Sequence, residues 1–272
     1  MKFTHIMLWL GLLLIFSSCK KDPDSLTVVN SQSFHERQVA LHFQPPSSSL
    51  QDFISNNDTL QPLGSITTEL DELNALKEMV IQSKDDQLWK ELKQKWNDFN
   101  VNYMGNSLIL NAEGQSVKAP LSPETAAKWA GLNIDLLKFS EEVPFGDALE
   151  ILLYGNSGYR FPDSLLKSII YTLVYDDIYI NIFGSSTMEY QHTTGGAVKL
   201  IQETNYPRGM DMILKIETSD VRLLNLFIRI PSWAVNPKVQ YGNVKYVAHP
   251  GQYCEVSKKW KRGDEITVSL KN

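Results

Sequence analysis

The spacing of the apolar residues changes once along the chain, and this change constrains the fold more than any other feature. Up to about residue 156 they recur every three or four positions, which predicts helices at 70–80, 88–99, 123–139 and 146–153. Beyond Pro162 they alternate, and this predicts antiparallel strands at 178–182, 197–203, 210–217, 224–230, 238–247, 252–257 and 265–270. The chain is therefore expected to be α+β, with a helical part followed by an antiparallel β-sandwich.

The size and net charge of the chain limit the kinds of protein that it can be. Its 272 residues are 43% hydrophobic, which is enough for a substantial core. The 26 Lys and Arg and the 31 Asp and Glu residues give a net charge of -5 without long like-charge blocks. A surface that binds nucleic acid by neutralising phosphates is disfavoured, so no nucleic-acid partner is expected.

The N-terminus has the layout of a secretory signal, which we predict to be residues 1–18. Lys2 precedes an apolar run at 6–16, which is too short to cross the roughly 30 Å of a bilayer core. The run ends at Ser17-Ser18-Cys19, which resembles the bacterial lipobox, and this resemblance implies acylation of Cys19. The charged stretch at 20–24 resembles a tag for export to the cell exterior. We therefore expect a surface-exposed outer-membrane lipoprotein of a Gram-negative bacterium, with the lipid membrane as a partner through Cys19.

Composition divides the rest of the chain into three parts. Residues 19–63 are rich in Ser, Asn, Asp, Gln and Pro and predict a flexible tether, with one short strand at 39–43. Residues 64–160 form the helical region, in which 102–123 reverts to a loop or short hairpin. Residues 161–272 are expected to form the β-sandwich.

Several separated motifs of the second half resemble one family. They are 177–183 (DIYINIF), 202–207 (QETNYP), 226–234 (LFIRIPSWA), 250–253 (PGQY) and 260–264 (WKRGD). Their order and spacing resemble the C-terminal region of glycoside hydrolase family 127, the β-L-arabinofuranosidases and their relatives. The resemblance implies that the helical region is a remnant of an (α/α)6 barrel.

The resemblance also implies what a catalytic site would need. In the family a glutamate and cysteines hold zinc, and one cysteine is the nucleophile. Glu124 matches the zinc-binding glutamate, whereas Ala126 stands where a metal-binding cysteine belongs. The family's adjacent pair of cysteines is expected just before the sandwich, but residues 158–162, which span this place, contain no cysteine. Without a thiolate neither zinc binding nor attack on the sugar follows, so no metal and no cofactor are expected.

Other acids and the remaining cysteine are further candidates for catalytic groups. Glu150 follows Asp147 by three residues, which places both on one helical face, although an exposed face explains this spacing equally well. Glu124 is explained by the favourable position of a carboxylate at a helix N-terminus. Cys254 lies in a predicted strand, where a buried, unreactive thiol is favoured.

Aromatic side chains are the candidates for contact with a sugar. Trp233, Trp260 and Tyr253 offer flat faces on which a sugar ring can stack. Packing in the core is the favoured explanation for the two tryptophans, which match positions expected to be buried in the family.

Three hypotheses about function follow. The first is a non-catalytic, surface-anchored lipoprotein that captures arabinose-containing plant polysaccharides or oligosaccharides. The second is an active glycosidase with a non-standard site. The third is a structural module that docks other outer-membrane lipoproteins through the helices at 65–99.

Overall fold

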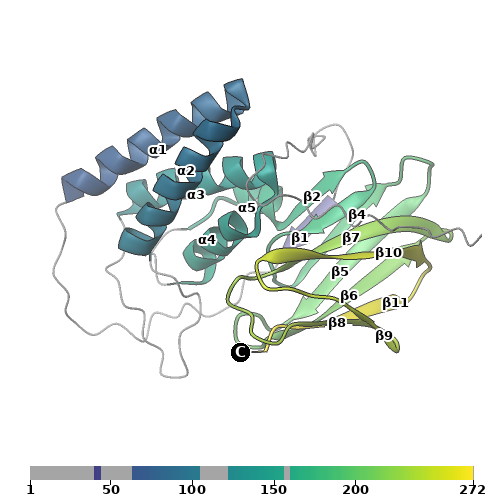
Figure 1. Cartoon of the computed structure of the whole chain (residues 1–272). Helices are drawn as coiled ribbons and strands as arrows, with labels where there is room; N and C mark the ends of the chain where they lie inside the picture. The colour runs from purple at the N-terminus through teal and green to yellow at the C-terminus, as the bar shows by residue number, and fades with distance from the viewer. Residues whose placement is uncertain (1–39, 44–62, 105–121, 156–159, 272) are drawn as a thin grey trace, which may run out of the picture.

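The computed structural model describes residues 40–43, 63–104, 122–155 and 160–271. Apart from one early strand, the helices in these ranges precede the strands, so the α+β organisation predicted from the apolar spacing is confirmed (Figure 1). No helix in the described ranges combines the length and the apolar character needed to cross a bilayer. The predicted signal peptide, Cys19 and most of the predicted tether lie outside the described residues.

The helical part contains five α-helices, with ends that local chemistry explains. They are α1 (Leu63–Ser83), α2 (Asp86–Phe99), α3 (Pro123–Ser140), α4 (Val143–Tyr154) and α5 (Asp163–Ile170). Asp85 caps α2, because its carboxylate accepts the N–H groups of Gln87 and Leu88 at 2.8 and 2.9 Å. Helix α4 begins three residues before the predicted start, since Pro144 fits the first turn of a helix, where its missing N–H is not needed.

Two further helical segments differ from the prediction. A π-helical turn (Asn100–Met104) extends α2 into the stretch predicted to be a loop; most of that stretch lies outside the described residues. The helical part also does not end near residue 156, because α5 follows Pro162. Its buried residues Leu166, Ile169 and Ile170 have helical spacing. A segment of eight residues is too short for this spacing to be distinguished from that of a strand in the sequence.

The helices share an aromatic core. Helix α1 packs against α2 and α3, and α3 packs against α4. The rings of Trp96 and Trp129 are stacked with centroids 5.6 Å apart, and Phe99 stacks on Trp129 at 4.9 Å. The Trp96 indole N–H donates to Asn133 Oδ1 at 2.9 Å, so this buried polar group is satisfied. The apolar stripes that predicted amphipathic helices are the faces buried here.

The second half of the chain and the early strand at 40–43 form two packed sheets. Their strands are β1 (Ala40–Phe43), β2 (Tyr171–Val174), β3 (Asp177–Ile180), β4 (Ser186–Gln191), β5 (Ala197–Thr204), β6 (Asp211–Thr218), β7 (Arg222–Ile230), β8 (Lys238–Tyr241), β9 (Val244–Tyr246), β10 (Gln252–Trp260) and β11 (Asp264–Ser269). The seven-stranded sheet has the order β1-β4-β5-β6-β11-β8-β9, and the four-stranded sheet has the order β10-β7-β3-β2. Strands β2 and β4 are additional to those predicted, and the predicted strand 238–247 is divided by a turn at Gly242.

Two strand pairings correct the sequence analysis. Strands β3 and β7 are parallel rather than antiparallel, which is possible because β4, β5 and β6 of the other sheet lie between them in the chain. Strand β1, predicted at 39–43 inside the tether, pairs with β4 at the edge of the seven-stranded sheet. This part of the predicted tether therefore belongs to the sandwich.

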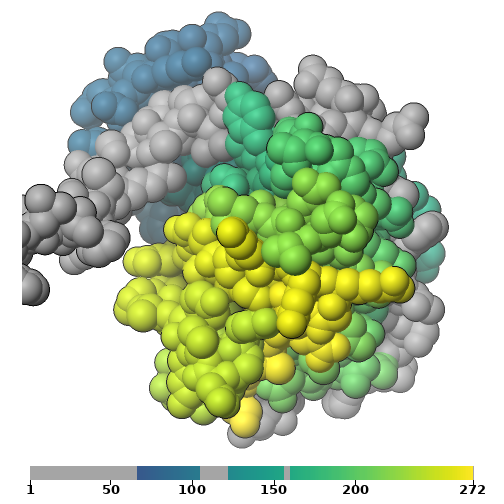
Figure 2. Space-filling view, turned by 90° about the vertical axis from the view of Figure 1, so that its right-hand side faces the viewer, coloured from purple at the N-terminus to yellow at the C-terminus, as the bar shows by residue number. Residues whose placement is uncertain are grey.

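Helices and sandwich share one continuous hydrophobic core. It includes Leu70 and Trp89 from the helices and Ile228 and Val256 from the sandwich. Strands coloured green to yellow form most of the molecular face in Figure 2. The helices are thus an integral part of the same body as the sheets.

Candidate functional site

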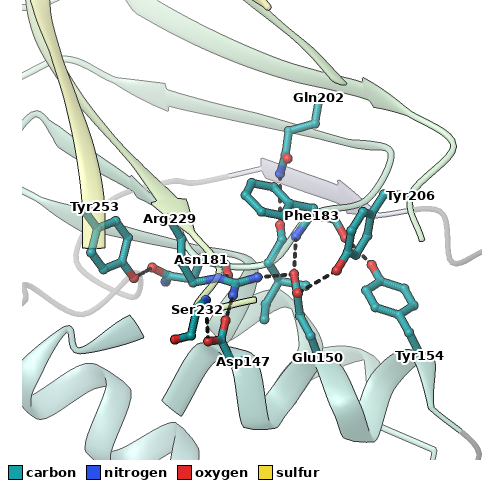
Figure 3. Close-up of polar contacts among 11 residues, drawn as sticks. Asp147, Glu150, Tyr154, Asn181, Phe183, Gln202, Tyr206, Arg229, Ser232 and Tyr253 are labelled. Carbon is teal, nitrogen blue, oxygen red and sulfur yellow. Dashed lines mark hydrogen bonds and ion pairs between the residues drawn. The ribbon is translucent and has the colours of Figure 1, made fainter. Parts of the chain in front are cut away.

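A buried arginine joins α4 to the four-stranded sheet. Arg229, on β7, has a fully buried side chain, and its guanidinium pairs with Asp147 through Nη1 and with Glu150 through Nη2 (Figure 3). Its Nε–H donates to the Asn181 carbonyl, and the ring of Phe183 lies 5.1 Å from its Cζ. The spacing of Asp147 and Glu150 does place them on one helical face, but this face is directed at the sandwich.

Glu150 is held by hydrogen bonds on both carboxylate oxygens. Its Oε1 accepts the Phe183 N–H at 3.1 Å, and its Oε2 accepts the Tyr206 hydroxyl at 2.9 Å. Burial raises the pKa of Glu150, and the Arg229 guanidinium acts in the opposite direction. Burial also raises the pKa of Tyr206. The Tyr154 hydroxyl donates to the Phe183 carbonyl and closes the network.

The contact of Arg229 with the acids of α4 depends on a close approach of this helix to the four-stranded sheet. The second oxygen of Asp147 accepts the Ser232 N–H at 3.0 Å. Gly146 lies directly over the arginine, and a Cβ at this position would be 2.9 Å from Arg229 Cδ. We call Asp147, Glu150 and Arg229 the Arg229 clamp. Its two acids have no freedom to approach a substrate in this arrangement, because each is bound to the same guanidinium.

The structure places Glu124 and Ala126 away from this network. The Glu124 side chain is 80% exposed in the first turn of α3, with its carboxylate 3.9 Å from Lys128 Nζ. Ala126, two residues further along α3, is fully buried. Glu124 and Glu150, the two acids considered as catalytic candidates, are therefore not brought together.

In the described ranges the thiol and imidazole groups do not come together to form a catalytic or metal-binding centre. Cys254 faces the sandwich core on β10, and burial raises the pKa of its thiol to about 11. His192 lies 3.4 Å from an Asp176 carboxylate oxygen, whereas His249 is exposed. Within residues 40–43, 63–104, 122–155 and 160–271, no three His, Cys, Asp or Glu side chains converge to hold a metal ion.

The aromatic candidates are separated by their burial. Trp260 is fully buried and its indole N–H donates to the Leu224 carbonyl at 2.9 Å, so it is a core residue and is removed from the candidate sugar contacts. Tyr253 is half-buried, and its hydroxyl donates to Asn181 Oδ1 at 2.6 Å. Trp233 is also half-buried. Of these three residues, only Trp233 and Tyr253 are partly exposed.

Arg229 and a surface groove are the features that the sequence analysis missed. A charged residue inside the otherwise apolar end of β7 was the available signal for the arginine. The groove, of about 1220 Å³, crosses β4, β5, β6, β11 and β8 of the seven-stranded sheet. Side chains directed away from the sandwich core line it, among them Thr187, Ile201, Glu203, Asp211, Ile213, Lys238, Thr267, Ser269 and Lys271. Its lining combines polar and charged side chains with the apolar side chains of Ile201 and Ile213.

The comparison with known families addresses the sandwich. Residues 177–272 match the family model of the β-L-arabinofuranosidase GH127 middle domain. The C-terminal region is GH127-like. The match begins at the first residue of β3 and includes the strand that carries Arg229. No curated protein matches the chain.

Solved structures extend the likeness to the helices. A glycoside hydrolase aligns with 73% of this chain and 45% of its own, at 17% identity and a TM-score of 0.57. A GH127 β-L-arabinofuranosidase from Geobacillus stearothermophilus T6 aligns with 74% of this chain and 41% of its own, at 18% identity and a TM-score of 0.57. Another GH127 β-arabinofuranosidase aligns with 76% of this chain and 42% of its own, at 17% identity and a TM-score of 0.55.

These matches show a shared fold over most of the described chain. Residues 171–271 are 101 of the 272 residues, so an alignment of 73% includes helices as well as the sandwich. The chain spans less than half the length of each of the three structures. The chain thus shares the fold of these structures, and its family-model match is confined to residues 177–272.

Proposed function

We propose that the chain is a non-catalytic, GH127-like lipoprotein that captures arabinose-containing plant glycans. The proposal includes cleavage after residue 18, an acyl anchor on Cys19 and exposure at the outer-membrane surface. The observation that carries the non-catalytic part is the Arg229 clamp, in which the two acids on the facing side of α4 are held by one buried guanidinium.

Hydrolysis by two carboxylates needs acids that can reach the glycosidic bond. In a retaining glycosidase they flank the bond at a separation of about 5 Å, and one must donate a proton. Glu150 is completely buried and tied to the sheet, and Glu124 is remote in solvent. The raised pKa of Cys254 leaves little thiolate for nucleophilic attack. These placements favour binding over turnover.

Glycan capture is supported by the shape and chemistry of the groove. Its hydroxyl, carboxylate and ammonium groups surround two apolar side chains, Ile201 and Ile213. Sugars present hydroxyl groups at the ring edge and C–H groups on the ring face, and both find partners in such a lining. Arabinose is suggested by the names of the GH127 structures that share the fold.

The docking hypothesis has less support. It requires an exposed apolar surface on the helices at 65–99. The apolar stripe of α1, which includes Leu70 and Leu73, is instead buried in the chain's own core, as are Trp89 and Trp96 of α2. Helices α1 and α2 have thus used their apolar faces internally.

Calorimetry of residues 20–272 tests the proposal. Oligosaccharides of arabinan, arabinogalactan and pectin are titrated into the protein, and hydrolysis of nitrophenyl β-L-arabinofuranoside is followed with and without zinc. An active GH127 enzyme is the positive control. Saturable heat without hydrolysis is expected. Zinc-dependent turnover would contradict the non-catalytic proposal, and the absence of binding to every glycan would contradict capture.

A pair of variants locates the binding. The double variant Ile201→Ser/Ile213→Ser removes the apolar floor of the groove and should weaken binding by about tenfold or more. The matched control Val221→Ser/Leu223→Ser changes two exposed apolar residues that do not line the groove. Equal affinities of both variants would place the glycan elsewhere.

A further inference from the structure

We infer that the groove recognises an oligosaccharide that carries a carboxylate, and that Lys238 and Lys271 bind this carboxylate. The inference rests on the proposed function, glycan capture, and adds the class of sugar and the residues that select it. It is carried by the strand register and by the distribution of ion pairs along the groove.

The strand register brings the relevant side chains into one row. Asp211 of β6 is paired with Ser269 of β11, and Ser269 is paired with Lys238 of β8. Residues paired in antiparallel strands point to the same face of a sheet, so these three side chains lie in a line across the groove. Lys271 follows Ser269 by two residues and also lines the groove. Both lysines therefore lie at the end of the groove formed by β11 and β8.

The ion pairs leave this end positively charged. Glu203 is already paired with Lys215, with Nζ and Oε1 2.6 Å apart. Neither Lys238 nor Lys271 has an ion-pair or side-chain hydrogen-bond partner in the part of the chain that the structure describes. Asp211 is the other acid that lines the groove, and its strand β6 lies two strands away from β8, which carries Lys238. Two cations next to each other favour an anionic group of the ligand.

A carboxylate suits this pair of cations. It has two acceptor oxygens, so it can receive charge-assisted hydrogen bonds from the ammonium groups of Lys238 and Lys271, both of which line the groove.

The adjacent row supplies a surface for the sugar ring. Glu203 pairs in register with Ile213, and Ile213 pairs with Thr267. An apolar side chain between a carboxylate and a hydroxyl suits a ring with C–H groups on its face and hydroxyls at its edge. This row favours a uronic acid residue over an acidic peptide. An acidic peptide has no ring hydroxyls, so it would leave the side chains of Glu203 and Thr267 without hydrogen-bond partners in the ligand.

Calorimetry with charged and neutral ligands tests the inference. Residues 20–272 are titrated with an oligogalacturonide, a neutral arabinan oligosaccharide and an oligoglutamate peptide. The variant Lys238→Gln/Lys271→Gln is compared with Lys245→Gln/Lys259→Gln, which removes the same charge from two exposed lysines outside the groove. Circular dichroism and thermal unfolding establish that both variants are folded.

The expected result is selective. The oligogalacturonide should bind the Lys238→Gln/Lys271→Gln variant about tenfold or more weakly, because two charge-assisted contacts are lost, and the control should bind as the parent does. Raising the ionic strength should weaken the parent's binding. Preferential binding of the neutral oligosaccharide, unchanged in both variants, would overturn the inference but leave glycan capture intact. Equal or tighter binding of oligoglutamate would overturn the sugar assignment. No binding of either sugar would overturn both proposals.

Discussion

The guanidinium of Arg229 lies inside the protein, with carboxylates at two nitrogens and a backbone carbonyl at the third. Isolated buried charges are costly, but a buried charge that is paired with opposite charges is tolerated. Removing one partner leaves the others uncompensated. The clamp is therefore sensitive to single substitutions, whichever of its members is changed.

Replacing Arg229 should destabilise the protein strongly. In Arg229→Met, two carboxylates lose their counterion, and one of them is fully buried, so the free energy of unfolding should fall by about 3–5 kcal/mol. Urea denaturation followed by circular dichroism measures the change. The control Arg222→Met, which removes an ion pair with the exposed Asp220 and a hydrogen bond to Thr194 Oγ1, should cost only about 1 kcal/mol. Similar losses in both variants would show that the clamp does not stabilise the fold.

The Cys254 thiol should be unreactive in the folded protein. With a pKa of about 11, only about one thiol in a thousand is ionised at pH 8, and the group is also shielded from reagents. The pKa is raised in the folded state, so the neutral form persists until the pH approaches 11. Residues 20–272 contain no other cysteine, so labelling reports on this group alone. We expect iodoacetamide to label it rapidly only in denaturant; rapid labelling of the native protein at pH 8 would contradict this burial.

At the level of elements, helix α4 carries the ion pairs that join the helical part to the four-stranded sheet, and α5 adds contacts with β1 and β2. Asp147 and Glu150 reach the sheet from one face of the helix, and Gly146 lets the helix axis approach. Glycine lowers helix stability by about 1 kcal/mol relative to alanine, so its presence inside α4 needs a packing reason. The nearby Arg229 side chain, which has no room to move, is that reason.

Two glycine substitutions should have opposite effects. Gly146→Ala places a methyl group 2.9 Å from Arg229 Cδ and 3.2 Å from its Nε, and overpacking of this kind costs about 1–3 kcal/mol. Gly131→Ala in α3 has no atom within 4 Å of the new methyl and should stabilise the protein by up to about 1 kcal/mol. Thermal unfolding of both variants provides the measurement. Stabilisation by Gly146→Ala would show that α4 does not pack as closely as described.

At the scale of the whole molecule, a continuous core makes helices and sandwich one body. The groove lies on the seven-stranded sheet, whereas the clamp joins α4 to the four-stranded sheet. Substitutions in the groove should therefore alter binding without disturbing the junction. Changes in the clamp should be detected first as a loss of stability.

Anchoring of the chain should depend on one thiol. In cells that express the full chain, Cys19→Ser should abolish incorporation of a labelled fatty acid and release the protein from the membrane fraction, because the acyl chains provide the apolar area that holds it there. Cys254→Ser is the matched control and should leave acylation unchanged. Fatty-acid label that persists in Cys19→Ser would contradict the lipidation prediction.

Local pattern was enough to predict the type of most elements. The helical spacing of Leu70, Leu73 and Leu76 and the alternation at 224–230 each describe a buried face within one element, so neither requires knowledge of the rest of the fold. The motifs between 177 and 264 likewise indicated the GH127-like sandwich. The short helix α5 was missed because eight residues hold too few repeats of either period.

Tertiary structure decided which charged and polar groups meet. Asp147 and Arg229 are 82 residues apart in the chain, so neither period nor spacing relates them, and their ion pair exists because α4 packs on β7. The parallel pairing of β3 with β7 and the row formed by Asp211, Ser269 and Lys238 also depend on the order of strands in the sheets. Sequence patterns alone predicted most of the elements and the GH127-like character of the sandwich, because both depend on residues that are close together in the chain. The clamp and the groove depend on contacts between distant segments, which only packing establishes.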